Sequence, residues 1–144
     1  MRSRRRRARE IAFQALYQSE HGQDSVDLAL AQILEERKAG PDASEYARSL
    51  VEAFSEHRSE IDRVISQTLE RWKMERLAAI DRSILRIATG ELLYGTGVPG
   101  EVVIDEAVEI AKKYSTEQSG AFVNGILDRL WRTAGKGTVV EGGD

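Results

Sequence analysis

The chain has 144 residues, no cysteine and a formal net charge of −3. This length fits one domain that can bury its own core, and the lack of cysteine excludes disulfides and thiolate metal sites. No apolar run approaches the roughly 20 residues that cross a bilayer. We expect a cytoplasmic protein without membrane contact. His21 and His57 share no ligand spacing, and we expect no metal or cofactor.

Positive charge is concentrated at the N-terminal end, where residues 2–9 read RSRRRRAR. Removing these six arginines from the count leaves residues 10–144 at −9. The apolar pattern that starts at Ala8 places Arg4 to Arg7 in the first turn of a helix. Cations there oppose the helix dipole at about 0.3–1 kcal/mol each. Because local stability favours acids at this point, we interpret the segment as a contact for a polyanion such as nucleic acid.

Three other interpretations of this segment remain open. It can be a solvated basic end that only aids solubility. It can be a transit peptide, although the helical pattern begins inside the arginines and favours a part of the fold. Contact with a membrane surface is a third reading, which the Ala-rich apolar stripe without tryptophan disfavours.

Apolar residues recur at helical spacing between a few proline and glycine breaks. The apolar stripes cover residues 8–16, 26–34, 46–54, 61–72, 77–93, 103–114 and 122–131. The sequence therefore predicts an all-α, compact bundle of about seven helices, as one domain over 1–132. The Gly-rich residues 133–144 are predicted to form a disordered tail.

Several residues predict helix ends and contacts. Asp24 or Ser25 suits the N-cap of the second helix, and Asp42 with Glu45 resembles a capping box for the third. The fifth stripe covers more than one helix face, which predicts a central helix buried on several sides. Glycine inside a helix costs about 1 kcal/mol relative to alanine, so Gly125 predicts the close approach of another helix.

Four segments resemble the NusB family of bacterial transcription antitermination factors. They are RRRAREIAFQALYQ at 5–18, IDRSILRIATGELLY at 80–94, VPGEVVIDEAVEIAKKY at 98–114 and SGAFVNGILDRL at 119–130. The resemblance implies a seven-helix fold and no enzymatic activity. It implies a heterodimer with the tenth small-subunit ribosomal protein (NusE) that binds single-stranded boxA RNA. The pair would join the RNA polymerase antitermination complex, chiefly on ribosomal RNA operons. The resemblance also allows a homodimer of the free protein.

The resemblance and the charge pattern together give a set of RNA-binding candidates. They are Arg4, Arg5, Arg6, Arg7, Arg9, Tyr17, Lys112, Lys113, Tyr114, Gln118, Ser119 and Phe122. Single-stranded RNA is held by phosphate contacts and by stacking of its bases on aromatic rings. The three rings can equally be core residues, and the two lysines can be an ordinary solvated helix end. If Ser119 caps the last helix, free backbone N–H groups nearby can meet a phosphate.

Two acids are candidates for the protein partner. In the family, the acidic position occupied here by Asp81 lies at the ribosomal-protein interface, and Glu75 is a second candidate. Either residue can instead be a solvated charge. Two rival functions stay open: a module that binds only protein, and a detached regulatory domain of an RNA-modifying enzyme. We predict no catalytic residues, because no nucleophile–base arrangement or phosphate loop is visible.

Overall fold

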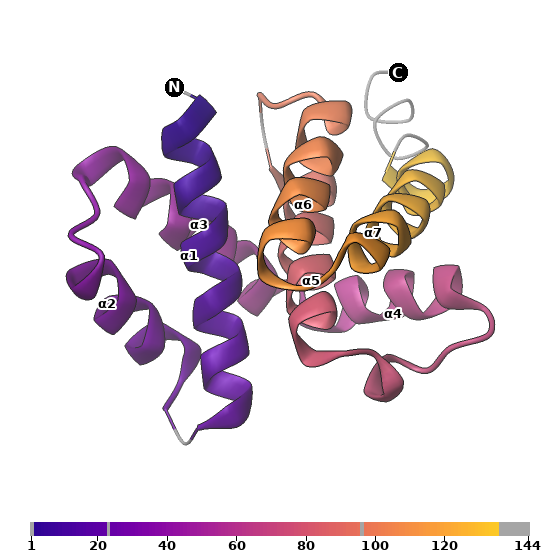
Figure 1. Cartoon of the computed structure of the whole chain (residues 1–144), viewed down its shortest axis with the longest axis horizontal. Helices are drawn as coiled ribbons and strands as arrows, with labels where there is room; N and C mark the ends of the chain where they lie inside the picture. The colour runs from indigo at the N-terminus through magenta and orange to yellow at the C-terminus, as the bar shows by residue number, and fades with distance from the viewer. Residues whose placement is uncertain (1, 23, 96, 136–144) are drawn as a thin grey trace.

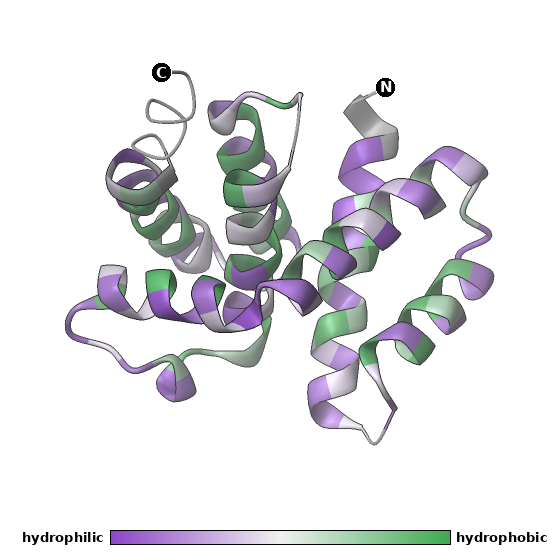
Figure 2. Cartoon of the chain, turned by 180° about the vertical axis from the view of Figure 1, so that it is seen from behind, coloured by the Kyte–Doolittle hydropathy of each residue, from purple (hydrophilic) through white to green (hydrophobic). Residues whose placement is uncertain are grey.

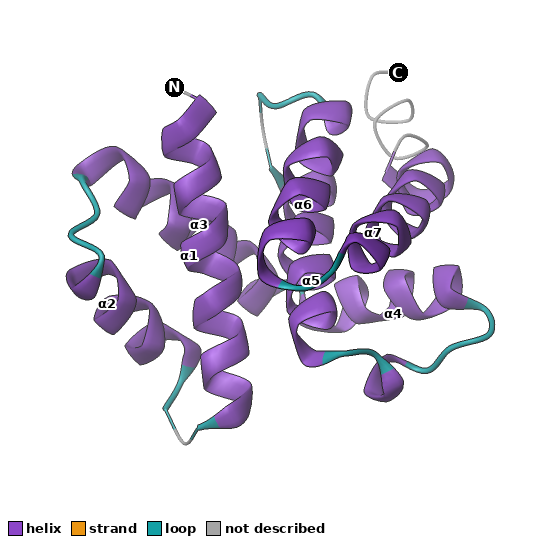
Figure 3. Cartoon of the chain, viewed as in Figure 1, coloured by secondary structure: helices purple, strands orange, loops and turns teal. Residues whose placement is uncertain are grey.

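The computed structural model describes residues 2–22, 24–95 and 97–135, with side chains described from Arg5 to Ala134. These residues form seven α-helices and no strand, which confirms the predicted all-α fold (Figures 1 and 3). The helices are α1 (Arg2–His21), α2 (Val26–Glu36), α3 (Pro41–Glu56), α4 (Arg58–Leu69), α5 (Ala79–Tyr94), α6 (Gly100–Tyr114) and α7 (Glu117–Leu130). A 3₁₀ turn, η1 (Met74–Arg76), precedes α5, and a π-helical turn, η2 (Trp131–Gly135), follows α7.

The helices form two groups that meet at α5. Helices α1, α2 and α3 lie on one side of the molecule, and α4, α6 and α7 gather around α5 on the other (Figure 1). Helix α1 packs against α2, α3 and α5, while α6 packs closely on α7. The arginine segment of α1 reaches α6 as well, because Arg6 and Arg9 both hydrogen-bond Glu106 of that helix.

Helix α5 is the centre of the core. Every residue from 83 to 92 is buried, which confirms the helix buried on several sides that the sequence predicts. The other helices bury one face each, and their ribbons alternate between hydrophobic and hydrophilic residues (Figure 2). Ile11, Ile61 and Leu127 are fully buried representatives of these faces. No helix among the described residues is long and apolar enough to span a membrane.

The helix starts agree only partly with the predicted caps. Ser25 caps α2 as predicted, because its side chain accepts a hydrogen bond from a backbone N–H of the first turn. The capping box of Asp42 and Glu45 is wrong. Helix α3 begins at Pro41 after the N-cap Gly40. A proline at the first helical position has the helical φ preset and lacks the N–H that a cap would satisfy.

Two predicted packing contacts are also wrong. Trp72 is not part of the fourth helical stripe, because α4 ends at Leu69 and the Trp72 side chain is 58% exposed. A Cβ atom on Gly125 would meet nothing within 4 Å, so no neighbouring helix requires glycine there. The close approach occurs at Gly100, where a Cβ would lie 2.5 Å from the Trp131 indole. The first residues of the predicted tail, 133–135, form part of η2. Residues 136–144 lie outside the described part of the chain.

Candidate nucleic-acid interface

The N-terminal arginines lie on the first turns of α1, but their surroundings differ. The guanidinium of Arg5 lies 4.9 Å from the centre of the Tyr46 ring, in the geometry of a cation–π contact. Arg7 is exposed and donates a hydrogen bond to the backbone oxygen of Arg37. The side chain of Arg4 lies outside the described residues. Arg5 and Arg7 therefore remain candidates for phosphate contact.

Arg6 is held by a buried acid on α6. Its Nε lies 2.9 Å from Oε1 of Glu106, and its Nη2 lies 2.6 Å from Oε2. The Arg6 side chain is 34% exposed, whereas the Glu106 side chain is fully buried. The hydrogen bond with Glu106 is the main reason that the pKa of Arg6 is raised. Arg6 thus joins α1 to α6 and still reaches the surface.

Arg9 is 4% exposed and lies in a buried network of acids. It makes two hydrogen bonds to Glu91, of 2.8 and 2.7 Å, and a third to Glu106 of 3.1 Å. Burial alone would lower the pKa of Arg9, but the bonds to Glu91 raise it overall. Tyr46 donates its hydroxyl to the same carboxylate of Glu91. This burial does not fit direct contact with RNA, and it makes Arg9 a residue that fixes α1 on α5 and α6.

Lys113 and Tyr114 end α6 and both bind Glu10 of α1. Lys113 Nζ lies 3.1 Å from Glu10 Oε2, and the Tyr114 hydroxyl donates to Oε1 over 2.8 Å. The Lys113 side chain remains 59% exposed. The Tyr114 ring packs edge-on against Phe13, with 5.1 Å between the ring centroids. Lys113 is therefore open to a ligand, while Tyr114 is largely occupied by contacts within the fold.

Lys112 crosses the start of α7 at Gly120. A Cβ on Gly120 would lie 2.7 Å from Lys112 Cγ, so glycine leaves the space through which the lysine stem passes. The Lys112 ammonium lies 3.5 Å from Glu109 and stays partly exposed. Gln118, in the first turn of α7, is exposed. These positions place polar side chains around the turn that joins α6 to α7.

Ser119 does not cap α7. The cap is Thr116, whose side chain accepts from the Ser119 N–H over 2.9 Å. The Ser119 hydroxyl is 3.1 Å from Asp81 Oδ2 and 2.8 Å from the Ser115 hydroxyl. Asp81 is only 8% exposed, and its Oδ1 has no hydrogen-bond partner among the described residues. Ser119 and Asp81 are thus buried against each other, and neither is a solvated side chain.

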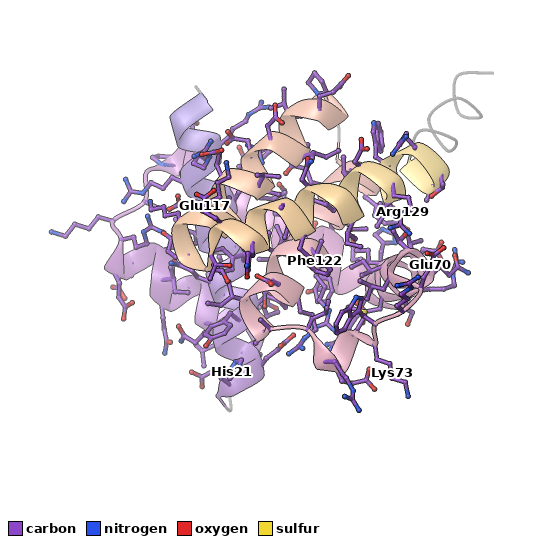
Figure 4. All side chains as sticks on the ribbon, turned by 45° about the vertical axis from the view of Figure 1, so that its right-hand side comes forward. His21, Glu70, Lys73, Glu117, Phe122 and Arg129 are labelled. Carbon is purple, nitrogen blue, oxygen red and sulfur yellow. The ribbon has the colours of Figure 1, made fainter. Side chains whose placement is uncertain are left out.

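The two remaining rings are half-buried. Tyr17 lies 4.3 Å from the ring of His21 near the end of α1. Phe122 packs against the core from α7 and borders a groove between α7 and the segment after α4 (Figure 4). Leu69, Trp72, Ala121, Gly125 and Ile126 also line this groove. Arg129 and Glu70 also line the groove and form an ion pair of 3.1 Å.

The structure brings together most of the sequence-predicted candidates, but not all. Arg5, Arg6 and Arg7 lie on α1, and Lys112 and Lys113 lie in the last turn of the neighbouring helix α6 (Figure 1). Tyr17 and Phe122 are not joined to these cations by a contact among the described residues. Sequence reasoning did not single out Arg37 or Trp72 as surface residues. Arg37 is isolated from the other basic residues, and Trp72 fits the spacing of the fourth apolar stripe, which predicts burial.

Comparisons with known proteins identify the family of this chain. Residues 6–132 match the model of the NusB family. Transcription antitermination protein NusB of Pseudothermotoga lettingae is 47% identical over 128 residues, covering 89% of this chain and 91% of that protein. The protein of the same name from Myxococcus xanthus is 43% identical over 130 residues, covering 88% and 93%.

Solved structures agree with the sequence matches. NusB of T. maritima superposes with a TM-score of 0.85 and 46% identity, covering 91% of this chain and 92% of that one. A crystal structure of antitermination factors NusB and NusE in complex with dsRNA superposes with a TM-score of 0.84 and 31% identity. The match covers 92% of this chain and 98% of that one. The fold and these matches define the class, which is that of the helical transcription antitermination proteins. The chain belongs to the NusB family.

Proposed function

We propose that this protein binds boxA-type single-stranded RNA as a heterodimer with the tenth small-subunit ribosomal protein (NusE). In this role it is a non-enzymatic factor that joins the antitermination complex on RNA polymerase and supports transcription of ribosomal RNA operons in the cytoplasm. The observation that carries the proposal is the match, over 92% of this chain, to a protein whose structure was solved with NusE and RNA.

The charge distribution supports RNA contact at the α1–α6 side. Exposed Arg7, half-exposed Arg5 and Arg6, and exposed Lys113 lie there in a chain whose residues 10–144 carry −9. A polyanion is repelled by an acidic surface and attracted to a local group of cations. Contact is therefore expected along one side of the molecule.

The aromatic residues favour a single strand over a duplex. The related complex contains dsRNA, and duplex RNA is recognised mainly by shape and backbone contacts. Stacking of unpaired bases requires a ring with an accessible face. The half-buried Tyr17 and Phe122 offer such rings on α1 and α7. We therefore propose a single strand whose phosphates meet the cations and whose bases reach one of these rings.

The partner surface is proposed at the groove beside Trp72. Tryptophan is enriched among the residues that dominate protein–protein binding energies, and Trp72 is 58% exposed beside the groove. Glu75 is exposed on η1, where it can pair with a basic partner such as a ribosomal protein. Asp81 is buried and does not reach the partner itself. We propose that it affects the partner surface indirectly, through its hydrogen bond to Ser119 and through the first turn of α5, where it lies.

The RNA proposal is tested by fluorescence anisotropy with labelled boxA-type RNA, with and without NusE, over a salt series. We expect log affinity to fall linearly with log salt, and Arg5→Ala with Arg7→Ala to lower the slope by about 0.7 for each lost contact. Arg132→Ala is the control, since this arginine lies in η2 and pairs with Asp128. A flat salt dependence would favour a protein-only module instead.

The partner proposal is tested by measuring NusE binding to Trp72→Ala and Glu75→Lys by calorimetry. Both variants are expected to weaken the complex without changing thermal stability, because both side chains are exposed. Leu28→Ala is the control, since Leu28 is a 49% exposed apolar residue on α2. Unchanged NusE affinity in Trp72→Ala would exclude the groove as the partner surface.

A further inference from the structure

Glu10 is a buried acid beneath the cationic side of the molecule. It is 3% exposed, and its two oxygens accept hydrogen bonds from three side chains. These are Tyr114 at 2.8 Å, Lys113 at 3.1 Å and Arg37 at 3.3 Å. The donors are 27 to 104 residues away in the sequence, so only the folded chain assembles this group. We call Glu10, Arg37, Lys113 and Tyr114 the Glu10 cluster.

We propose that the RNA-binding surface extends across α1 to Arg37, and that Glu10 is the positioning residue that presents Arg37 and Lys113 to the RNA backbone. This inference rests on the proposed RNA-binding function. It adds Arg37, a cation at the end of α2, to the proposed RNA-binding surface. Neither Glu10 nor Arg37 was predicted from the sequence, because Glu10 is acidic and Arg37 is isolated from the other arginines.

The position of Arg37 is fixed at its backbone. Lys38, at φ +52°, donates its N–H to the Glu35 oxygen, and Ala39 donates to the Leu34 oxygen. This pair of bonds is the Schellman arrangement that ends many helices. The Arg37 oxygen also accepts a hydrogen bond from Arg7. The end of α2 is therefore attached to the arginine segment of α1.

The Arg37 side chain is also held by hydrogen bonds, but it remains accessible. Its Nη1 donates to Gln14 over 3.2 Å and its Nη2 to Glu10. The Arg37 side chain is 29% exposed and the Lys113 side chain 59%. A guanidinium has five N–H donors and an ammonium three, so both cations keep donors for phosphate oxygens. Arginine suits this role because its fork matches two oxygens at once.

An acid within an RNA-binding surface has a physical purpose here. Arg7, Arg37 and Lys113 are three cations that would repel one another without a counter-charge. Glu10 offsets that repulsion and leaves the group with excess positive charge. It also orders long side chains when the protein folds, so less rotamer freedom is lost when RNA binds. The Glu10 cluster therefore holds two cations, Arg37 and Lys113, in place for phosphate contacts on either side of α1.

The first experiment measures boxA-type RNA binding by Arg37→Gln over a salt series, with and without NusE. Loss of one phosphate contact lowers the salt slope by about 0.7, which is about a fivefold loss of affinity at 0.1 M salt. Arg63→Gln is the matched control, because Arg63 also pairs with a carboxylate, Glu60, but on α4. Wild-type affinity and slope in Arg37→Gln would overturn the extension to α2.

The second experiment uses Glu10→Gln, which removes a negative charge without changing the size of the side chain. Electrostatics alone predicts tighter RNA binding, whereas a positioning role predicts weaker binding and a smaller salt slope. Glu36→Gln, an exposed acid beside Arg37, is the control and should bind RNA as well as wild type or slightly better. Tighter binding by Glu10→Gln would overturn the positioning role.

The outcomes separate this inference from the function on which it rests. If the wild type with NusE ignores boxA-type RNA at low salt, the proposed function fails. Only the extension fails in a second case. There the wild type binds RNA, the double variant Arg5→Ala with Arg7→Ala binds it more weakly, and Arg37→Gln binds it as well as the wild type. Circular dichroism checks the fold of each variant, and partly exposed Arg37 keeps the extension testable if Glu10→Gln does not fold.

Discussion

Ser119 and Asp81 are joined by a hydrogen bond of 3.1 Å between the first turns of α7 and α5. The sequence predicts that Ser119 contacts RNA and that Asp81 contacts a protein partner, so this bond connects the two proposed surfaces. The other Asp81 oxygen is buried without a partner among the described residues. A change at either residue is therefore expected to affect the packing of both helices.

Ser119→Ala should lower the free energy of unfolding by about 1–3 kcal/mol, because Asp81 then loses the hydrogen bond from the Ser119 hydroxyl. Asp81→Asn should cost less, since its carbonyl still accepts from Ser119 and no buried charge remains. Urea unfolding monitored by circular dichroism measures both values. An Asp81→Asn protein that is less stable than Ser119→Ala would contradict this account of the pair.

Arg9 is expected to matter for stability more than for RNA binding. Arg9→Met leaves Glu91 and Glu106 buried without their shared cation, and breaking a buried ion pair in this way costs about 3–5 kcal/mol. Arg132→Met removes an exposed pair with Asp128 and should change stability by less than about 1 kcal/mol. Chemical denaturation of both variants provides the comparison, and equal stabilities would show that the buried network is not structural.

Two glycines should respond in opposite directions to alanine. A methyl group on Gly125, inside α7, would meet nothing within 4 Å, so Gly125→Ala should raise the free energy of unfolding by up to about 1 kcal/mol. At Gly100, a methyl group would lie 2.5 Å from Trp131, and Gly100→Ala should cost about 1–3 kcal/mol. Thermal melts of the two variants test the pair, and a loss of stability in Gly125→Ala would reveal a contact at that position.

Tyr46 should make stability depend on alkaline pH. Burial, and then its hydrogen bond to Glu91, raises the pKa of Tyr46 from 10.0 to about 12. Between these values the folded protein holds a proton that the unfolded chain has lost, so stability present below pH 10 declines as the pH rises toward 12. Tyr46→Phe removes this contribution, and its unfolding free energy should fall less steeply with pH. Urea unfolding from about pH 9 to 11 measures the two slopes, which would be identical if folding did not raise the pKa of the Tyr46 hydroxyl.

The fold class and the buried faces follow from the order of residues in the chain. Helical periodicity indicates which side of a helix avoids water, so it predicts without tertiary information that residues such as Ile11, Leu85 and Leu127 are buried, and they are. The same logic identified α5 as central, since apolar residues cover more than one of its faces. The family resemblance also came from the sequence, because its motifs follow the chain in order.

The role of each charged side chain, in contrast, depends on how the helices pack. Arg7 and Arg9 are two residues apart in one basic segment, yet Arg7 is exposed and Arg9 is 4% exposed between two acids. Glu91 and Glu106, which hold Arg9, are 82 and 97 residues away from it. A charge is stabilised by the partners that surround it in space, and local sequence does not contain those partners. For this reason only the folded chain shows three features. They are the Glu10 cluster, the hydrogen bond between Ser119 and Asp81, and the exposure of Trp72.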